Sequence, residues 1–490
     1  MILSRTEMLE AEAAAFARDA SAADLMESAG HQMAVMAAQF LPQPGRCLVF
    51  AGKGHNGGDV FVAARHLAAL GWQIEVEKIF PDSELAPLTF AQLSKLSGRS
   101  ECHPATRGPL LVLDGLLGIG AAGDPRGPVA DAIRRINHLR THSGAWVFSA
   151  DIPSGLDADS GLPSEPCVVA DATIAMGFIK SGLVTDAATR FVGRLAVAEL
   201  PDLAPLPAAD KASVISPHFL RPLVPPRNFD THKGLSGRVA ILAGSAGYTG
   251  AARLCSEAAV RGGAGLITLF VPPEIYPILA ASAIPEVMVR PAGSLTEVLD
   301  STWNAIAIGP GLGRDRDRAV LEILRQAACP CVVDADALNA VSAGSLSVFS
   351  NPPAPRLLTP HPGEMERLSP CNGRTRRTWA EDFTAAFPVT LLLKGSRTLI
   401  AEAGQPSLFN TTGNPGMATG GMGDVLTGVC AALLAQGKPA FESAAVGAWA
   451  CGHAAEIAIA RGASQESLGA TDVVRSLGHA FTALRSENTL

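Results

Sequence analysis

The glycine-rich segment 410–428 is the part of the chain whose residue types are most suited to chemistry. It reads Asn-Thr-Thr-Gly-Asn-Pro-Gly-Met-Ala-Thr-Gly-Gly-Met-Gly-Asp-Val-Leu-Thr-Gly, and Asp424 lies where an apolar helix is predicted to begin. Glycines let the backbone approach a ligand and present N–H groups to it, and a helix N-terminus attracts phosphate. A carboxylate beside such a turn predicts phosphoryl transfer, in which Asp424 takes the proton of an attacking hydroxyl.

Six other polar or glycine-rich turns precede this segment in the second half of the chain, each at the end of a predicted strand. They are residues 232–234, 244–250, 309–313, 334–339, 359–364 and 393–398. Packing alone explains one such turn, but it does not explain an ordered series of them. The series therefore predicts a single site that several loops build together.

The residue types in these turns suggest individual roles. Lys394 can bind a nucleotide phosphate as a point charge, unless it is a solvated lysine at a strand end. Glu364 can organise Mg²⁺ through water, or it can simply place a charge at a helix N-terminus. His361, between two prolines, is a candidate substrate contact or an ordinary turn residue. Asp334 and Asp336 are either ligands or caps.

Three loops in the first half also follow predicted strands. Residues 52–59 read Gly-Lys-Gly-His-Asn-Gly-Gly-Asp, residues 114–120 read Asp-Gly-Leu-Leu-Gly-Ile-Gly, and residues 151–157 read Asp-Ile-Pro-Ser-Gly-Leu-Asp. A single glycine loop is often only a tight turn, and either Asp114 or Asp151 could merely cap one. Three such loops at the carboxyl ends of parallel strands predict a shared ligand crevice.

The elements that must position these loops alternate between strand and helix. In the first half we expect helices at 1–39, 60–70 and 131–138 and strands at 47–51, 74–79, 110–113 and 146–150. After a Pro- and Ala-rich stretch the pattern restarts with strands at 238–243, 266–271, 305–308, 331–334 and 356–359. This alternation predicts an α/β protein with doubly wound parallel sheets. We expect domains at 1–205 and 227–490, joined by a linker at 206–226.

The composition limits the classes of function. The chain has 490 residues, 48% of them hydrophobic and 17% charged, which is typical of several folded domains. A net charge of −7 without a basic run argues against nucleic-acid binding. Neither a signal peptide nor an apolar run of membrane-spanning length is apparent, so we expect a soluble, cytoplasmic protein without membrane contact. The nine cysteines form no C-x-x-C pair and the histidines lack metal-ligand spacing, which predicts reduced thiols and no zinc site.

The three motifs of the first half resemble those of the NAD(P)H-hydrate epimerase domain, a Rossmann-like fold, over roughly residues 1–205. The resemblance implies substrate contacts from His55, Asn56, Gly57, Gly58, Asp59, Gly118, Ile119, Gly120, Ala121, Ala122, Gly123, Asp124 and Asp151. It also implies a potassium ion bound by Asn56, Asp114 and Ser154. Asp114, Asp151 and Lys180 are the catalytic candidates, although Lys180 could instead be a solvated surface lysine. Residues 121–126 depart from the family pattern, which leaves a binding module without catalysis as an alternative.

The second half resembles the ribokinase-like carbohydrate kinase superfamily and, more closely, the NAD(P)H-hydrate dehydratase domain, over roughly residues 215–485. The motif at 359–364, Thr-Pro-His-Pro-Gly-Glu, is more specific than the general kinase loop. The resemblance implies hydrate contacts from Ala251, Gly311, His361 and Asp424. It implies adenine-nucleotide contacts from Lys394, Gly395, Ser396, Arg397, Thr398 and Gly423.

The order of the two halves resembles the bacterial bifunctional NAD(P)H-hydrate repair family. This resemblance implies an enzyme that interconverts the (R) and (S) hydrates of NADH or NADPH and dehydrates the (S) form. It implies ADP as the phosphoryl donor, with Mg²⁺, and it leaves the preference between the two hydrates open. We also expect a homo-oligomer, since large α/β enzymes of this kind often self-associate. The main alternative is a kinase that releases a phosphorylated sugar or vitamin.

Overall fold

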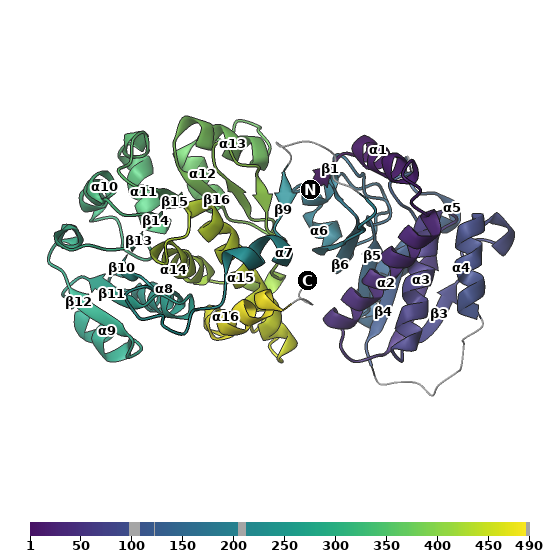
Figure 1. The fold of residues 1–490 in the computed structure, drawn as a ribbon, viewed down its shortest axis with the longest axis horizontal. Coiled ribbons are helices and arrows are strands. Elements are labelled where there is room, and N and C mark those ends of the chain that lie inside the picture. Colours follow the sequence, from purple (N-terminus) through teal and green to yellow (C-terminus); the bar gives the residue numbers. More distant parts are fainter. Residues whose placement is uncertain (98–107, 122, 204–211, 487–490) are drawn as a thin grey trace. The chain divides into compact units, whose positions relative to one another are not determined.

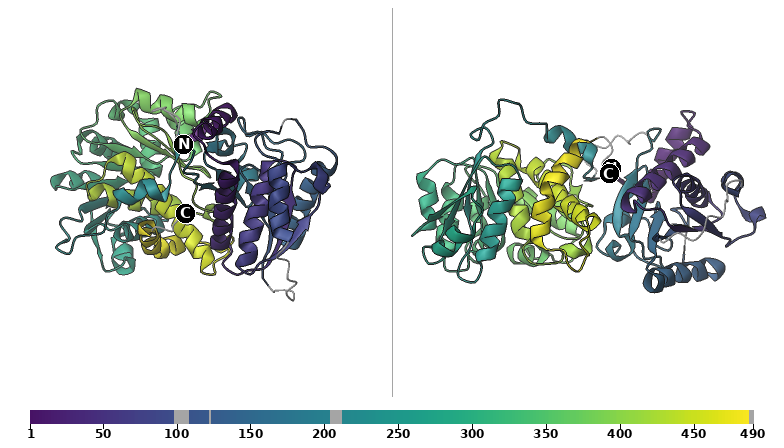
Figure 2. Two further views of the ribbon diagram at one scale, coloured as in Figure 1. Left: turned by 45° about the vertical axis from the view of Figure 1, so that its right-hand side comes forward. Right: turned by 90° about the horizontal axis from the view of Figure 1, so that it is seen from below.

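The computed structural model describes residues 1–97, 108–121, 123–203 and 212–486. The chain divides into two compact units, Met1–Lys211 and Ala212–Thr489, which Figures 1 and 2 draw as ribbons. Each unit is an α/β structure built on its own, mostly parallel sheet, so the predicted fold class is confirmed. No helix within these described ranges is both long enough and apolar enough to cross a membrane.

The first unit is built on six parallel strands in the order β3-β2-β4-β5-β6-β8. The strands are β2 (Arg46–Ala51), β3 (Gln73–Glu77), β4 (Leu110–Gly115), β5 (Trp146–Ala150), β6 (Ala172–Met176) and β8 (Arg194–Ala198). Side chains alternate between the two faces, so Cys47 and Val49 join one core while Leu48 and Phe50 join another. Both faces of the sheet are therefore buried over β2, as a parallel sheet requires.

Helices cover both faces of this sheet. They are α1 (Arg5–Phe16), α2 (Ala22–Phe40), α3 (His55–Ala69), α4 (Pro87–Ser97), α5 (Gly127–Ser143) and α6 (Thr189–Val192). The core that contains Cys47 and Val49 is shared with α1, α2, α3 and α4, and the other core is shared with α5. Figure 1 shows α2, α3 and α4 side by side on one face. The predicted strands at 47–51, 110–113 and 146–150 are confirmed, whereas β6 and β8 were not predicted.

The single helix predicted for residues 1–39 is wrong. The chain begins with a short strand, β1 (Ile2–Leu3), and two helices follow it, α1 and α2. They separate at Asp19, whose φ of 65° is left-handed and incompatible with a continuous helix. Strand β1 pairs in parallel with β7 (Ile179–Lys180), which sets Leu3 opposite Lys180. The N-terminal segment therefore lies beside one of the predicted site residues.

The second unit is built on a ten-stranded sheet in the order β12-β11-β10-β13-β14-β15-β16-β17-β18-β9. The strands are β9 (Ser213–Val214), β10 (Arg238–Leu242), β11 (Leu266–Val271), β12 (Val287–Pro291), β13 (Ala305–Ile308), β14 (Cys331–Val333), β15 (Arg356–Leu358), β16 (Thr390–Leu393), β17 (Leu399–Ala401) and β18 (Leu408–Phe409). Neighbouring strands from β12 to β16 are parallel, whereas β17 runs antiparallel to both β16 and β18. All five strands predicted for this half are confirmed.

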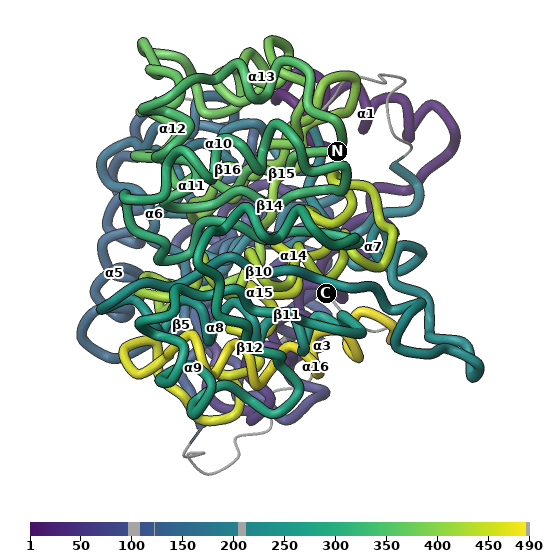
Figure 3. Tube along the Cα trace, turned by 90° about the vertical axis from the view of Figure 1, so that its left-hand side faces the viewer, coloured from purple at the N-terminus to yellow at the C-terminus, as the bar shows by residue number. Residues whose placement is uncertain are grey.

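Two layers of helices enclose this sheet. They are α7 (Pro217–Leu220), α8 (Thr249–Arg261), α9 (Tyr276–Ser282), α10 (Asp317–Gln326), α11 (Ala335–Ala343), α12 (Pro362–Leu368), α13 (Arg376–Ala386), α14 (Met422–Ala435), α15 (Ala440–Ala460) and α16 (Ala470–Arg485). Helices α8, α14, α15 and α16 share one core with the sheet, and α10, α11 and α12 lie on its other side (Figures 1 and 3). Every residue of α14 from Val425 to Ala435 is buried, which fixes its first turn at the edge of the core.

The segment 206–226, which we expected to be a linker, divides between the two units. Residues 204–211 lie outside the described ranges, but Ser213 and Val214 form β9, which pairs in parallel with β18. Helix α7 follows, and Leu220 is fully buried in the core of the second unit. The second unit therefore begins at Ala212, because even a two-residue edge strand gains backbone hydrogen bonds from the sheet.

Candidate functional site

Asp424 lies in the first turn of α14, as the sequence predicts. The helix is preceded by Gly421, whose φ is 91°, and no side chain caps the first N–H groups. A side chain at Gly421 would also place its Cβ 2.5 Å from Cδ1 of Leu254, so only glycine fits. Burial, helped by the nearby charge of Asp334 and opposed by Lys394, raises the pKa of Asp424 to about 7. Asp424 is therefore poised to exchange a proton near neutral pH.

Lys394 and Asp334 form an ion pair beside this turn, with 2.8 Å between Nζ and Oδ1. Asp334 is only 1% exposed, and its other oxygen, Oδ2, accepts a 2.8 Å hydrogen bond from the hydroxyl of Thr427 in α14. Burial acts to lower the pKa of Lys394, but Asp334, Glu364 and Asp424 outweigh it and raise that pKa. Lys394 is therefore a cation that is fixed by its ion pair with Asp334, and the alternative of a freely solvated lysine is wrong.

The loop that follows Lys394 is shaped by Arg376 of α13. The Arg376 guanidinium donates to the carbonyls of Leu393 and Lys394 at 3.1 and 3.2 Å. A Cβ at Gly395 would lie 2.7 Å from Nη2 of Arg376, so a larger residue there would displace the guanidinium. The sequence did not indicate Arg376, because it lies in a separate helix with no motif around it.

The other residues that we predicted to contact the nucleotide differ in their exposure to solvent. Gly395 and Ser396 are exposed and Thr398 is half-buried, but Arg397 is only 4% exposed. Arg397 therefore contributes its backbone, rather than a solvent-facing guanidinium, to this surface. Gly423 joins the group from α14, since a Cβ there would lie 3.3 Å from Nζ of Lys394.

His361 and Glu364 form a reciprocal cap at the start of α12. The backbone N–H of His361 donates to Oε2 of Glu364 at 2.8 Å, and Nδ1 of His361 accepts from the N–H of Gly363 at 3.0 Å. Glu364 is thus a helix N-terminal charge, and its Oε2 is also 3.8 Å from Nζ of Lys394. The His361 side chain is 51% exposed beside it, so it is free to meet a ligand.

Ala251 and Gly311, which we expected to contact one substrate, are neighbours. Gly311 has a φ of 61°, and a Cβ there would lie 3.0 Å from Cβ of Ala251. The hydroxyl of Ser245 donates to the carbonyl of Gly311 at 2.8 Å, which ties the loop before α8 to the loop after β13. Asp336 accepts from the N–H of Gly313 at 2.9 Å, so it holds this loop in place.

In the first unit, Asp114 is fully buried at the end of β4. It accepts hydrogen bonds from the Ser154 hydroxyl at 2.6 Å, the Ser154 N–H at 2.9 Å and the Ser149 hydroxyl at 2.8 Å, with a weaker one from the N–H of Leu116 at 3.3 Å. Burial raises the pKa of Asp114, although these hydrogen bonds act in the opposite direction. Asp114 therefore joins the end of β4 to β5 and to the loop that follows β5, rather than facing open solvent.

Asn56 lies beside this junction, in the first turn of α3. Its side-chain amide donates to the carbonyls of Leu117 and Ala150, both at 2.9 Å. Gly57 and Gly58 are buried, and a Cβ would lie 2.2 Å from the carbonyl oxygen of Gly52 or 2.5 Å from Sδ of Met26. These two glycines thus let α3 pack closely, while the preceding residue, His55, is exposed.

Asp151 and Lys180 form a buried ion pair at the ends of β5 and β7, with side chains 10% and 1% exposed. Asp151 has a left-handed φ of 66° and also accepts from the N–H of Met176 at 2.9 Å. Lys180 donates further to the carbonyls of Met176 and Phe178. The alternative of a solvated surface lysine is therefore wrong.

Two more carboxylates lie in the electrostatic field of this pair. Burial, with the charges of Asp151 and Glu12, raises the pKa of Asp59 well above its usual value. Burial likewise raises the pKa of Glu12, against the opposing charge of Lys180. Sequence analysis missed Glu12, because it lies in α1 and no motif marks it.

The loop 118–124 borders the same region but is mostly exposed. Gly118 lies against Asn56, since a Cβ there would be 3.4 Å from Cγ of Asn56. The carbonyl of Gly120 accepts a 3.4 Å hydrogen bond from Arg5 of α1. Ile119 is half-buried, whereas Ala121, Gly123 and Asp124 are exposed; Ala122 lies outside the described residues.

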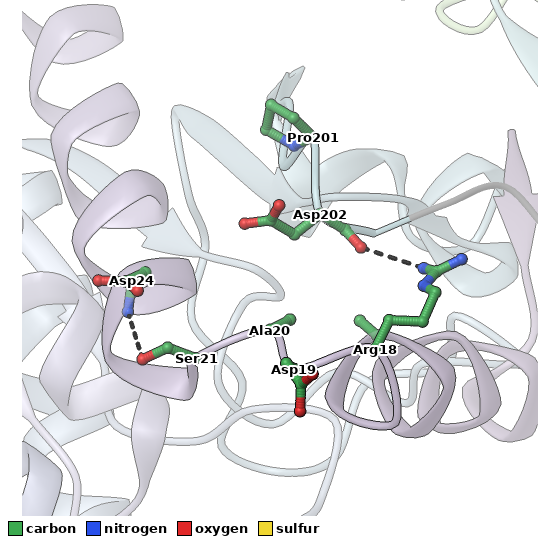
Figure 4. A pocket seen from close by; sticks show the side chains of 8 residues that line it. Arg18, Asp19, Ala20, Ser21, Asp24, Pro201 and Asp202 are labelled. Atoms are coloured by element: carbon green, nitrogen blue, oxygen red, sulfur yellow. Dashed lines mark hydrogen bonds between the residues drawn. The ribbon is translucent and has the colours of Figure 1, made fainter.

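A cavity of about 510 Å³ in the first unit lies away from all of these residues (Figure 4). It is lined by residues 15, 18–21, 24, 201 and 202. Figure 4 shows the guanidinium of Arg18 donating to the carbonyl of Asp202 across it. No predicted site residue lines this cavity, so we assign the chemistry to the loops at the strand ends.

Known proteins match both units of the chain. Residues 239–477 match the NAD(P)H-hydrate dehydratase family, and residues 22–182 match the family described as the YjeF-related protein N-terminus. The bifunctional NAD(P)H-hydrate repair enzyme Nnr of Moorella thermoacetica is 38% identical over 90% of this chain and 88% of that protein. The chain belongs to the family of bifunctional NAD(P)H-hydrate repair enzymes. The Escherichia coli repair enzyme Nnr is 34% identical over 93% of the chain and 88% of its own length.

Solved structures place the second unit of this repair enzyme among ribokinase-like proteins. A ribokinase-like superfamily protein from Enterococcus faecalis is 30% identical with a TM-score of 0.50, covering 58% of this chain and 99% of that one. The ADP/ATP-dependent NAD(P)H-hydrate dehydratase of Bacillus subtilis, co-crystallized with ATP and Mg²⁺, is 27% identical with a TM-score of 0.50, covering 56% and 98%. The predicted family and the ribokinase-like fold are therefore confirmed.

Proposed function

We propose that the second unit dehydrates the (S) hydrate of NADH or NADPH by phosphorylating its ring hydroxyl with ADP. The observation that supports this most is Asp424, a carboxyl with a pKa of about 7 at the uncapped start of α14, beside the Lys394–Asp334 pair. A base with this pKa can take a hydroxyl proton at neutral pH, and the neighbouring cation and bare N–H groups suit the phosphate that the hydroxyl attacks.

The reaction proceeds in two stages. Asp424 takes the proton of the ring hydroxyl while the oxygen attacks the terminal phosphorus of ADP, so a new P–O bond forms and AMP leaves. Phosphate then departs from the ring carbon, assisted by the lone pair of the ring nitrogen, and loss of a proton from the adjacent carbon restores the double bond. The N–H groups of residues 420–423 stabilise the charge that develops on the phosphoryl oxygens.

Residues 394–398 and Gly423 would bind ADP, and Ala251, Gly311 and His361 would bind the hydrate. Mg²⁺ in proteins uses one or two carboxylates together with waters and phosphate oxygens. Glu364 would be the single carboxylate, since it lies beside Lys394, the proposed phosphate-binding residue, and no group of three acidic, His or Cys side chains suited to a metal occurs within the described ranges. Bound Mg²⁺ would neutralise phosphate charge, and Glu364 would hold it through water.

The first unit, we propose, interconverts the two epimers so that all of the hydrate can be repaired. Asp151 and Lys180, with Asp114, are its proposed catalytic residues, and residues 55–59 and 118–124 with Asp151 would bind the hydrate. The proposal includes a potassium ion bound by Asn56, Asp114 and Ser154, because all three offer the hard oxygen atoms that an alkali cation prefers. The 2.6 Å hydrogen bond from Ser154 to Asp114 brings two of them together.

We further propose that the protein acts as a cytoplasmic homo-oligomer. Its substrates form wherever NADH and NADPH are used, which favours the cytoplasm. Phe229 and Leu235 of the second unit are large apolar side chains that are exposed to solvent, and contact with a second copy of the chain would bury them. Size-exclusion chromatography with light scattering would test this, since a monomer at all concentrations would contradict it.

The function is tested by adding the whole protein to a mixture of both epimers of hydrated NADPH with ADP and Mg²⁺. We expect absorbance at the reduced-nicotinamide band to return in full, because epimerisation supplies the (S) form continuously. If the enzyme rapidly restored only the absorbance that corresponds to the (S) epimer and left the (R) epimer unrepaired, the proposed epimerase activity would be contradicted. No recovery with either ADP or ATP would contradict the dehydratase, and a stable phosphorylated alcohol would indicate a kinase.

A further inference from the structure

Tyr248 is a large aromatic residue that the structure leaves on the surface of the second unit. Its side chain is 64% exposed, and its phenolic oxygen has no hydrogen-bond partner within the described part of the chain. An exposed aromatic ring loses little conformational entropy when it contacts a ligand, since only two side-chain torsions must be fixed. The ring is therefore available for a partner that stacks on it.

The backbone that carries this ring is held firmly. The N–H of Tyr248 donates to the carbonyl of Ser245 at 2.9 Å, and the hydroxyl of Ser245 donates to the carbonyl of Gly311 at 2.8 Å. Gly311 approaches so closely that a Cβ there would lie 2.9 Å from Cβ of Tyr248. The backbone and Cβ from which the ring projects are thus fixed before any ligand arrives, so that only the two side-chain torsions remain to be ordered on binding.

The space next to Tyr248 is open and lined by N–H groups. Tyr248 immediately precedes α8, and no side chain caps the first N–H groups of that helix. A Cβ added at Gly247, Gly250 or Gly420 would meet no atom within 4 Å, so the backbone there is accessible. The start of α14, also uncapped, packs against α8 where Gly421 meets Leu254. Both uncapped N-termini favour phosphate, they belong to helices that pack against each other, and Tyr248 immediately precedes the first of these helices.

We propose that Tyr248 stacks on the adenine ring of the hydrated dinucleotide, while the first N–H groups of α8 face its pyrophosphate. This inference rests on the proposed function of the second unit. Adenine is planar and aromatic and stacks well on a tyrosine, whereas the hydrated nicotinamide ring contains tetrahedral carbons and stacks poorly. Tyr248 is thus a substrate-positioning residue, and the reacting hydroxyl is left to Asp424.

The test compares Tyr248→Ala and Tyr248→Phe in the whole protein, with two hydrated substrates and ADP. One substrate is hydrated NADH, and the other is hydrated reduced nicotinamide mononucleotide, which lacks adenine. Tyr248→Ala should raise KM for hydrated NADH about tenfold with kcat within about twofold, and Tyr248→Phe should restore the wild-type value. KM for the mononucleotide should not change. Phe219→Ala, which removes another exposed aromatic ring, is the matched control and should leave both KM values unchanged.

Three outcomes would overturn the inference. These are an unchanged KM for hydrated NADH, an equal rise for the mononucleotide, and a rise in KM for ADP instead, which would assign the ring to the co-substrate. Thermal melting of each variant checks that folding is intact. Because each outcome is read against an active wild-type protein, it differs from failure of the proposed function, which would leave the wild type without turnover.

Discussion

Each of the two units has a lysine–aspartate ion pair at the carboxyl ends of its parallel strands. In the first unit, Lys180 and Asp151 are 1% and 10% exposed, and backbone carbonyls of Met176 and Phe178 bind the remaining protons of the ammonium group. In the second unit, the side chain of Lys394 is 20% exposed, and the side chain of its partner Asp334 is 2% exposed. The first pair is closed to solvent, whereas the second keeps its cation accessible to a ligand.

The difference teaches which group performs the proton transfer in each unit. A paired carboxylate is already stabilised by its cation, so a third carboxylate nearby is the one whose proton affinity rises. In the second unit that third group is Asp424, and in the first unit Asp59 and Glu12 occupy the equivalent electrostatic position. We therefore expect Asp424 to exchange the proton in the second unit, and Asp59 and Glu12 to assist the proposed catalytic residues of the first unit by exchanging protons beside the Asp151–Lys180 pair.

The largest effect is expected from Asp424→Asn, which removes the proposed base without changing shape. The rate of dehydration should fall by roughly 10²–10⁴-fold, the usual contribution of a general base, while interconversion of the epimers, followed by chromatography, continues at the wild-type rate. The matched change in the first unit, Asp59→Asn, should do the reverse. If Asp424→Asn abolished both activities, the two units would not act as independent sites.

The next largest effect is expected from breaking the closed pair. Lys180→Met leaves Asp151 buried without its cation, which should reduce the free energy of unfolding of the first unit by about 3–5 kcal/mol. Lys394→Met should cost less, because loss of Lys180 also leaves the backbone carbonyls of Met176 and Phe178 without its hydrogen bonds. Urea titration followed by circular dichroism measures both, and the double variant Asp151→Asn/Lys180→Met should recover part of the loss. Equal losses in the two units would contradict the contrast between a closed and an open pair.

Many of the strands and site residues could be predicted from the sequence, because the patterns that indicate them are formed by residues close together in the chain. Strands that are buried on both faces appear as short apolar runs, and Asp424 precedes a run that becomes the fully buried helix α14. Contacts between distant segments left no such signal. Lys180 lies in β7, which pairs with the distant strand β1. Lys394 is paired with Asp334, which in turn accepts a hydrogen bond from Thr427 of α14.

The same limit explains what sequence analysis missed or misplaced. Glu12 and Arg376 act from helices whose own sequences carry no motif, and α1 and α2 separate at a single left-handed residue, Asp19. Edge strands such as β9 are only two residues long, too short for periodicity to register. Local pattern thus predicts which residues reach a strand end, while tertiary packing decides which of them become ion pairs.

A smaller effect is expected on the pH dependence of dehydration. Since Asp424 must be deprotonated to act, kcat/KM should rise with pH up to a plateau above its pKa of about 7. Asp334 raises that pKa, so Asp334→Asn should move the rising limb to lower pH by about one unit. Thr427→Val, which removes a hydrogen bond to Asp334 but no charge, is the control and should not change the pH at which kcat/KM rises. If that pH were also unchanged in Asp334→Asn, a group other than Asp424 would control the rise.

The smallest effect is expected on the stability of Asp424→Asn. The variant that loses dehydration activity should be more stable than the wild type at pH 8. A carboxyl whose folded pKa lies above its unfolded value stabilises the fold at low pH, and that stability is lost as pH rises through about 7. Asp424→Asn does not titrate, so at pH 8 it should be more stable than wild type by about 1–2 kcal/mol, with no difference near pH 4.

Asp114→Asn is the informative contrast, because burial raises the pKa of that carboxyl as well. Asp114 accepts hydrogen bonds from Ser149, Ser154 and the backbone of Leu116, and an amide would turn a donor toward donors that need an acceptor. The variant should therefore lose about 1–3 kcal/mol at pH 8, where the Asp424 variant gains. Opposite signs, measured by chemical denaturation, would show that the hydrogen bonds to Asp114 outweigh the cost of burying its charge, whereas no such bonds within the described residues offset that cost at Asp424; a gain at both positions would mean that burial alone sets the contribution of each carboxyl to stability.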